Sequence, residues 1–210
     1  MIKKRYYLTI ILLLLIGTLI FNSCGQKSSL EEEAYIKRIE DSRAQKDSIL
    51  HSDPNSPFNF KGKVDFHPLN YFEVNPNFVL TSKFFENESK DTIKVFGTKG
   101  EERTAIRFGF LKLKYNEQKF QLNIYESIYK DTLKYYSIWF TDETTNNETY
   151  GVGRYINFEL NENPNHIYSI DFNKAYNPYC AYTSAYSCAI PTKEDHINIA
   201  ITAGEKKFHD

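Results

Sequence analysis

The chain has 210 residues and a formal net charge of −1 at pH 7, so its overall charge provides no attraction to nucleic acid or to an anionic membrane. Aromatic residues are abundant, with 16 tyrosines and 16 phenylalanines. This composition excludes a collagen-like, coiled-coil or disordered chain and is typical of one compact domain with a core of moderate size. We therefore expect no nucleic-acid partner.

The first residues are predicted to form an export signal. A basic cluster at positions 3–5 precedes an apolar run over residues 8–21, which is short for a membrane-spanning helix and typical of a signal peptide. The run ends at Ser23 and Cys24, and a small residue before a cysteine resembles the cleavage site of a bacterial lipoprotein. We predict a lipoprotein signal peptide over residues 1–23 and a lipid on Cys24. The alternative is a short, uncleaved membrane anchor.

A lipid on Cys24 would tether the rest of the chain to a membrane of the cell envelope. Gly25 follows the cysteine, at the position where aspartate would favour retention in the inner membrane, so we predict an outer-membrane location. The expected partners are the membrane, reached through the lipid, and either a small polar ligand or another envelope protein.

Residues 24–57 are predicted to form a tether and a charged helix. Ser29 and Glu32 have the spacing of a capping box, which predicts a helix over residues 29–50. A cluster of Ser, Asp, Asn and Pro over residues 51–57 ends the helix. The apolar stripe along the helix is narrow, which is typical of a solvated stalk. It continues to the end of the helix, however, and this favours partial docking on the domain.

Residues 58–210 are predicted to form a β domain. Apolar and polar residues alternate in short runs that turn-forming residues separate, with almost no helical periodicity between them. The predicted strands cover residues 78–85, 91–96, 103–115, 119–125, 134–141, 151–160, 167–172 and 197–202. Alternating strands of this kind are typical of antiparallel sheets. We expect a mainly β fold, an antiparallel barrel or sandwich preceded by the N-terminal helix.

The second half of the chain carries a series of short motifs. They are Phe140-Thr-Asp142, Thr149-Tyr-Gly-Val-Gly-Arg-Tyr155, Asp171-Phe-Asn173, Ala175-Tyr-Asn-Pro178, Cys180-Ala-Tyr182 and Ala203-Gly-Glu-Lys206. With these motifs the chain resembles the DUF1684 family of bacterial and archaeal proteins of unknown function, over residues 40–207. The resemblance implies a common fold and a shared polar cluster, and it implies no activity. Two positions depart from the family pattern: Ala189 replaces a proline, and Asp195 replaces an asparagine.

The two cysteines of the second half admit several chemistries. If Cys24 carries a lipid, Cys180 and Cys188 are the two that remain of three cysteines, and in an exported protein they are predicted to form a disulfide. The alternatives are two buried thiols, a metal site with His196, or a nucleophilic Cys180 with His196 as base and Asp171 as orienting group. The spacing lacks the close ligand pair of most zinc sites, and no cation near in sequence would activate the thiol. We therefore expect no metal.

A second group of candidates is polar. The residues predicted to bind a ligand are Asp142, Arg154, Tyr155, Asp171, Asn173, Asn177 and Glu205. Arginine is suited to bidentate pairing with carboxylates, so Arg154 either belongs to a buried network with Asp142 and Asp171 or anchors an anionic or polyhydroxylated ligand. In the second case tyrosines would form the walls of the pocket. These are Tyr150, Tyr155, Tyr176 and Tyr182.

We expect a ligand- or partner-binding module, with no catalytic residues and no cofactor. The alternative is an envelope hydrolase that uses a cluster around Asp142, Asp171 and Cys180, and a purely structural role is a third possibility. The sequence has no Gly-rich phosphate loop, nucleophile-elbow serine, HExxH motif or EF-hand loop. Catalysis predicts that the carboxylates converge with Arg154 in an open pocket. A scaffold role predicts that they are buried and paired with one another.

Overall fold

The structure is a computed structural model that describes residues 29–60, 64–129 and 133–209. The chain divides into two compact units, one that ends at Ala34 and one that begins at Tyr35. The predicted signal peptide and the predicted lipidation site Cys24 lie outside the described residues. Within the described ranges, no helix is both long enough and apolar enough to cross a membrane.

Helix α2 spans Leu30–Ser52. The backbone N–H of Glu32 donates to the Oγ of Ser29 at 3.1 Å, which confirms the predicted N-terminal cap. Within the second unit, Ile39 and Leu50 of this helix are buried. The guanidinium of Arg43 donates to the backbone oxygen of Phe72 at 2.9 Å. From Tyr35 onward the helix is therefore docked on the β domain, as its continued apolar stripe predicts.

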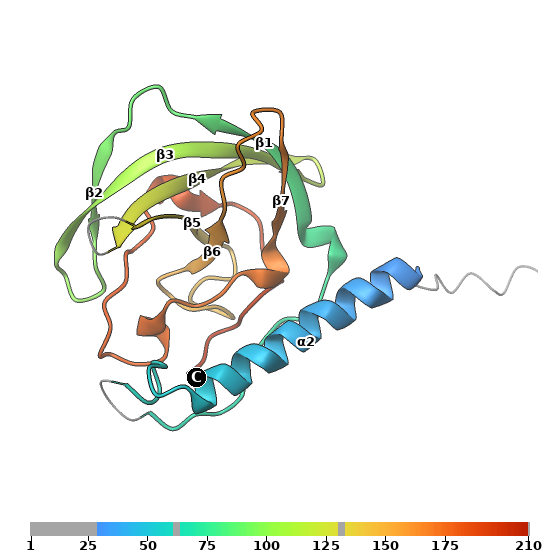
Figure 1. Cartoon of the computed structure of the whole chain (residues 1–210), viewed down its shortest axis with the longest axis vertical. Helices are drawn as coiled ribbons and strands as arrows, with labels where there is room; N and C mark the ends of the chain where they lie inside the picture. Colours follow the sequence, from blue (N-terminus) through green and yellow to red (C-terminus); the bar gives the residue numbers. More distant parts are fainter. Residues whose placement is uncertain (1–28, 61–63, 130–132, 210) are drawn as a thin grey trace, which may run out of the picture. The chain divides into compact units, whose positions relative to one another are not determined.

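Eight strands are found in the described ranges. They are β1 (Val79–Glu86), β2 (Thr92–Phe96), β3 (Glu102–Tyr115), β4 (Gln118–Tyr129), β5 (Leu133–Asp142), β6 (Arg154–Phe158), β7 (Ile167–Asp171) and β8 (His196–Ile197). The order in the sheet is β6-β5-β4-β3-β1-β7, with β2 beside β3 and β8 beside β5. All pairs are antiparallel except β5 with β8. The sheet curls into a half-barrel (Figure 1), which confirms the predicted fold class.

The prediction of a last strand over residues 197–202 is wrong for most of that range. Only His196–Ile197 forms a short strand. The carbonyl groups of Ile201 and Ala203 accept hydrogen bonds from the side chain of Arg154 instead of from a neighbouring strand. Because a side chain satisfies these backbone acceptors, Ile201 and Ala203 are buried without joining the ladder of the sheet.

Both faces of the central strands are buried, because successive side chains of a strand point to opposite faces. On β5, Ile138 and Phe140 pack into the main core together with buried residues of β3, β4 and β6. Their neighbour Trp139 packs on the opposite face, in a smaller cluster. That cluster consists of Val95, Ala105, Tyr125, Trp139 and Ala189, with Ile93 and Tyr155 packed against it. One face of the sheet therefore builds the core, and the other can build a site.

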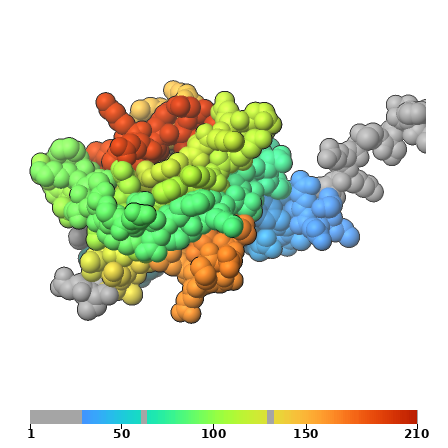
Figure 2. Space-filling view, turned by 90° about the horizontal axis from the view of Figure 1, so that it is seen from above, coloured from blue at the N-terminus to red at the C-terminus, as the bar shows by residue number. Residues whose placement is uncertain are grey.

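The two edge strands of the sheet, β6 and β7, follow each other in the chain. Phe158 of β6 stacks on Tyr168 of β7, with 4.8 Å between ring centroids, so side chains cover the gap between the edges. The connection between these strands, drawn in orange, projects from the surface (Figure 2), and residues 159–165 are exposed. Side chains of the two edge strands thus contact each other on the core side of the sheet.

Candidate functional site

Arg154 lies at the start of β6, and its side chain bonds to other parts of the protein. Its Nη2 donates to the Oδ2 of Asp142 at 2.6 Å, and both side chains are 1% exposed. The same guanidinium donates to the backbone oxygens of Ile201 at 2.9 Å, Glu205 at 3.3 Å and Ala203. Burial lowers the pKa of Arg154, and Asp142 opposes that shift. Arg154 thus fastens the C-terminal segment to the sheet, as the buried-network interpretation predicts.

Asp142 is fully engaged as well. Its Oδ1 accepts hydrogen bonds from the backbone N–H of Thr144 at 2.6 Å and from the Thr144 hydroxyl at 2.5 Å, while Oδ2 accepts from Arg154. The Thr144 hydroxyl also contacts the hydroxyl of Thr149 at 3.0 Å. With both oxygens occupied and no exposure, this carboxylate orders a turn and is not placed for acid–base chemistry.

Glu205 links three segments that are distant in sequence. Its carboxylate, 1% exposed, forms an ion pair with Lys46 of α2. Oε2 also accepts hydrogen bonds from the backbone N–H of Asn177 at 2.8 Å and from the Tyr182 hydroxyl at 2.7 Å. A buried carboxylate needs this many partners, because its desolvation is otherwise too costly. Glu205 therefore fixes the position of α2 against the C-terminal segment.

Asp171 caps the short 3₁₀ helix that follows β7, Phe172–Lys174, and Asn173 lies within that helix. The Oδ1 of Asp171 accepts from the backbone N–H of Asn173 at 3.0 Å and from the hydroxyl of Tyr35 at 2.9 Å. The Asn173 amide bonds both the N–H and the carbonyl of Asn75, each at 2.8 Å. These two predicted binding residues therefore have structural partners.

A cavity of about 990 Å³ lies against the face of the sheet opposite the main core. Period-2 alternation places Ser137, Trp139 and Tyr155 in its sheet wall. Helix α2 contributes a second wall, and the segments after β7 contribute a third. The lining residues from these two walls that matter below are Arg43, Lys46, Asn173, Lys174, Tyr176, Cys188 and Glu205.

Of the seven predicted binding residues, the cavity brings together Tyr155, Asn173 and Glu205. The other four do not line it; these are Asp142, Arg154, Asp171 and Asn177. Among the four predicted tyrosine walls, Tyr155 and Tyr176 line the cavity and the other two do not. The prediction missed the lining residues of α2 and of β5. Two signals in the sequence could have identified them. One is the apolar stripe along which α2 docks on the domain, and the other is the alternation on β5, which places Trp139 on the face opposite the main core.

The aromatic wall is rigid. Trp139 is stacked between Tyr125, at 4.3 Å between centroids, and Tyr155, at 5.7 Å. The Tyr155 hydroxyl donates to the backbone oxygen of Ala189, and burial raises the pKa of Tyr155. The Tyr176 hydroxyl donates to the Oδ1 of Asn157 at 2.7 Å. Burial raises the pKa of Tyr176 to about 12, so its phenol is neutral at pH 7.

Behind this wall lies a buried carboxylate, that of Asp195. Its side chain accepts hydrogen bonds from the Tyr125 hydroxyl at 2.9 Å and from the Asn123 amide at 2.8 Å. It also accepts from the backbone N–H and the hydroxyl of Thr192, at 2.7 and 2.8 Å. Asp195 is one of the two residues predicted to depart from the family pattern. The carboxylate here holds Tyr125, and through Tyr125 it supports the stack on Trp139.

Three polar atoms among the described residues border this cavity without a partner. They are the Oγ of Ser137, the hydroxyl of Tyr71 and the Nε of Arg43. Ser137 is only 4% exposed. A buried hydroxyl without a partner costs about 1–3 kcal/mol, and native proteins seldom leave one without a water or ligand partner. The cavity wall therefore includes buried polar atoms that have no hydrogen-bond partner within the described protein.

Cys180 and Cys188 lie beside this cavity and are both free thiols, so the predicted disulfide is not formed in the structure. The backbone N–H of Cys180 donates to the Sγ of Cys188 at 3.2 Å. A hydrogen bond from Cys188 is the largest influence on Cys180 and lowers its pKa to about 7, although burial opposes it. The same interaction raises the pKa of Cys188. Formation of the disulfide in an oxidising compartment stays a prediction.

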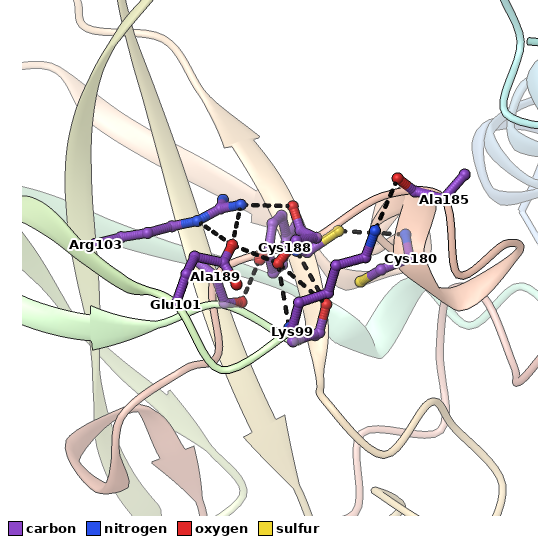
Figure 3. A network of polar contacts seen from close by, with 10 residues as sticks. Lys99, Glu101, Arg103, Cys180, Ala185, Cys188 and Ala189 are labelled. Carbon is purple, nitrogen blue, oxygen red and sulfur yellow. Dashed lines mark hydrogen bonds and ion pairs between the residues drawn. The ribbon is translucent and has the colours of Figure 1, made fainter. Parts of the chain in front are cut away.

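The loop that carries Cys188 is held by the turn between β2 and β3 (Figure 3). Lys99 donates to the backbone oxygen of Ala185 at 3.2 Å, and Arg103 donates to that of Ser187 at 3.0 Å. Glu101 accepts from Arg103 at 2.6 Å and from the Ser187 hydroxyl at 2.5 Å. These contacts fix the loop as one wall of the cavity.

His196 is not positioned as the metal and nucleophile alternatives require. Its Nδ1 contacts the hydroxyl of Thr141 at 3.0 Å, and its Nε2 lies 3.5 Å from the carboxylate of Glu143. In the part of the chain that the structure describes, no three His, Cys, Asp or Glu residues gather as metal ligands would. The ring of His196 is thus held at the edge of β5 and not at Cys180.

Comparisons with known proteins agree with this fold. The model of the family described as "Protein of unknown function (DUF1684)" matches residues 64–206. An uncharacterised protein of Haloarcula marismortui, solved by solution NMR, has 23% sequence identity and a TM-score of 0.62. The similarity covers 84% of this chain and 96% of that chain, and at this identity it shows the fold alone. No curated protein matches the chain.

We predict that Arg154→Ala lowers the free energy of unfolding by about 3–5 kcal/mol, because it leaves the buried Asp142 charge uncompensated. The control is Lys114→Ala, which breaks the exposed pair with Glu117 at 3.1 Å and should cost less than about 1 kcal/mol. Urea denaturation followed by circular dichroism measures both variants. Similar small losses would contradict the scaffold role of Arg154.

The lowered pKa of Cys180 predicts a pH-dependent reactivity of the reduced protein. The thiolate is the reactive form, so alkylation of Cys180 by iodoacetamide should rise steeply through about pH 7, whereas Cys188 should stay unreactive to much higher pH. Peptide mass spectrometry after short pulses of reagent follows each thiol separately. Equal reaction rates for the two cysteines at pH 7 would show that the hydrogen bond between them does not control the titration.

Proposed function

Because the chain belongs to the family described as "Protein of unknown function (DUF1684)", and this description names no activity, we propose a function on the basis of the cavity. The protein is an exported, lipid-anchored protein that binds a small organic ligand. The observation that carries this proposal is the cavity itself, about 990 Å³ with an aromatic sheet wall, in which Ser137 also keeps a buried hydroxyl without a partner. A scaffold that served only for stability would gain by replacing this hydroxyl with an apolar group.

The form of the cavity supports a binding role. Its volume of about 990 Å³ falls at the upper end of the range of ligand pockets, about 300–1,000 Å³. Such pockets combine aromatic walls with a few well-placed polar groups. Trp139 and Tyr155 supply the aromatic part here, and the polar part includes Ser137 and Arg43.

The proposed location in the cell envelope rests on the N-terminal sequence. The apolar run over residues 8–21 is followed by Cys24, where a lipid would be attached, and Gly25 favours the outer membrane. A ligand-binding protein tethered there would meet molecules outside the inner membrane. The membrane is therefore a proposed partner through the lipid, and nucleic acid is not.

Hydrolysis around Asp142, Asp171 and Cys180 receives less support. None of these three residues lines the cavity, and both oxygens of Asp142 are engaged by Thr144 and Arg154. Asp171 is engaged by Tyr35 and by the 3₁₀ helix that it caps. A general acid or base must be able to reach its substrate, so binding is the function that the geometry favours.

Blocking the cavity should abolish binding of a small molecule. We predict that the neutral dye N-phenyl-1-naphthylamine binds the purified protein with a rise in fluorescence. Ser137→Phe should weaken this binding at least about ten-fold, because a phenyl ring occupies the space of the ligand. The control Thr81→Phe places the same ring at an exposed position of β1 outside the cavity and should bind like the wild type. Unchanged binding by a folded Ser137→Phe variant would contradict the assignment of the cavity.

Lipid attachment is tested at Cys24. In the native host, Cys24→Ala should remove the acyl mass from the N-terminal peptide and release the protein from the membrane fraction, because no lipid remains to hold it. Cys188→Ala is the matched control and should leave both the lipid and the fractionation unchanged. Membrane association of the Cys24→Ala protein without any acyl mass would favour the uncleaved anchor instead.

A further inference from the structure

The charges around the cavity indicate the class of ligand. We propose that the ligand is an organic anion with a planar aromatic body. It would lie against Trp139 and Tyr155, with its anionic group toward Arg43 and Lys174. This inference rests on the proposed binding function and makes its chemistry specific.

Basic side chains predominate in the lining. It contains four basic residues, Arg43, Lys46, Arg103 and Lys174, and one acidic residue, Glu205. The single carboxylate is already neutralised, since Glu205 is paired with Lys46 and accepts two further hydrogen bonds. Positive charge is therefore left over around the cavity, and low-dielectric walls focus such a field on the space within.

Arg43 is the main source of this positive charge on the helix wall, where its Cζ lies 4.4 Å from the centroid of the Tyr71 ring. Its Nη1 and Nη2 donate to the backbone oxygens of Phe72 at 2.9 Å and Asn173 at 3.3 Å, and its Nε has no partner. These acceptors are neutral, so they orient the guanidinium without cancelling its charge. Burial lowers the pKa of Arg43 more than the nearby carboxylates of Glu40 and Asp171 raise it. An anion at this place would offset the desolvation of the guanidinium.

Two further cations lie along the same cavity. Lys174 is exposed and is placed at the rim, where it can attract an anion without a large desolvation cost. Arg103 uses its Nε and Nη2 to hold Glu101, at 2.9 and 2.6 Å, and Nη1 takes no part in those bonds. The cationic groups therefore extend from the helix wall to the loop that carries Cys188.

The sheet wall suits the apolar part of such a ligand. The stack of Trp139 on Tyr125 and Tyr155 is held in place, and a flat ring can join an aromatic stack at little conformational cost. A neutral sugar would gain nothing from the positive charge of Arg43 and Lys174, and an aromatic cation would be repelled by it.

Calorimetric titration of the purified protein with four compounds tests this inference. They are 2-naphthoate, its neutral isostere 2-naphthamide, the cation 2-naphthylmethylammonium and the uncharged disaccharide maltose. We expect 2-naphthoate to bind at least about ten-fold more tightly than the amide. The difference in affinity between 2-naphthoate and the cation should be larger than this. Binding of the anion should also weaken as the salt concentration rises.

A charge reversal at the rim of the cavity tests whether the preference for an anion depends on the basic residues there. Lys174→Glu should weaken 2-naphthoate binding about five-fold and leave 2-naphthamide unchanged, since only the anion responds to the field. The matched control Lys119→Glu reverses an exposed charge on β4 outside the cavity and should leave both affinities unchanged. Both lysines are exposed, so neither variant should disturb folding.

The outcomes separate the two proposals. If the amide, the cation or maltose binds as tightly as 2-naphthoate, and Ser137→Phe abolishes that binding, the anion assignment is wrong and the cavity remains a binding site. If none of the four compounds binds but N-phenyl-1-naphthylamine does, the anion assignment is wrong and the cavity remains a binding site. If the dye fails to bind as well, both the anion assignment and the binding function are overturned.

Discussion

A buried guanidinium holds this fold together. Arg154 enters the interior at the start of β6, pairs with Asp142 at 2.6 Å, and binds the backbone oxygens of a segment that has almost no strand structure of its own. A buried charge of this kind is tolerated only when its hydrogen-bonding capacity is nearly filled. The C-terminal segment supplies backbone oxygens that accept hydrogen bonds from Arg154, and these bonds fix the segment against the sheet.

The candidate site depends on this arrangement step by step. Because the segment is fixed, Glu205 meets Lys46 and holds α2 in place. Helix α2 in turn forms the wall that faces Trp139 and Tyr155 across the cavity. On the sheet side, Asp195 and Tyr125 support the same aromatic stack from behind. Paired polar groups thus build the scaffold, and the aromatic stack that they support forms the sheet wall of the cavity.

Much of the architecture could be predicted from the sequence, because period-2 alternation and turn residues are local signals. Strands β1 to β7, the cap at Ser29 and the docking of α2 follow from such signals. The predicted strand over residues 197–202 failed because its carbonyl partner is a side chain, that of Arg154, which no local pattern reveals. The polar cluster around Arg154 was identified, but sequence alone left a network and a ligand anchor as alternatives. Only the contacts of its guanidinium distinguish them.

The cavity itself was harder to predict, because its walls come from segments far apart in the chain. Arg43 and Lys46 lie on a helix whose surface is mostly charged, so only their spacing of four and seven residues from Ile39 marks them as neighbours of its docked stripe. Trp139 sits between two core residues of β5 and was not distinguished from them. The predicted residues that do line the cavity, such as Tyr155 and Glu205, lie within residues 64–206, the range that the family model matches.

Trp139 also gives the most direct test of the account. It is the single tryptophan of the chain, so an ¹H–¹⁵N spectrum shows one indole N–H signal from the sheet wall of the cavity. The account predicts that this signal and the backbone amide of Ser137 shift together and saturably as 2-naphthoate is added. A titration that shifts amides elsewhere on the domain, and leaves the indole and Ser137 signals unmoved, would contradict the central claim that this face of the sheet is a ligand site.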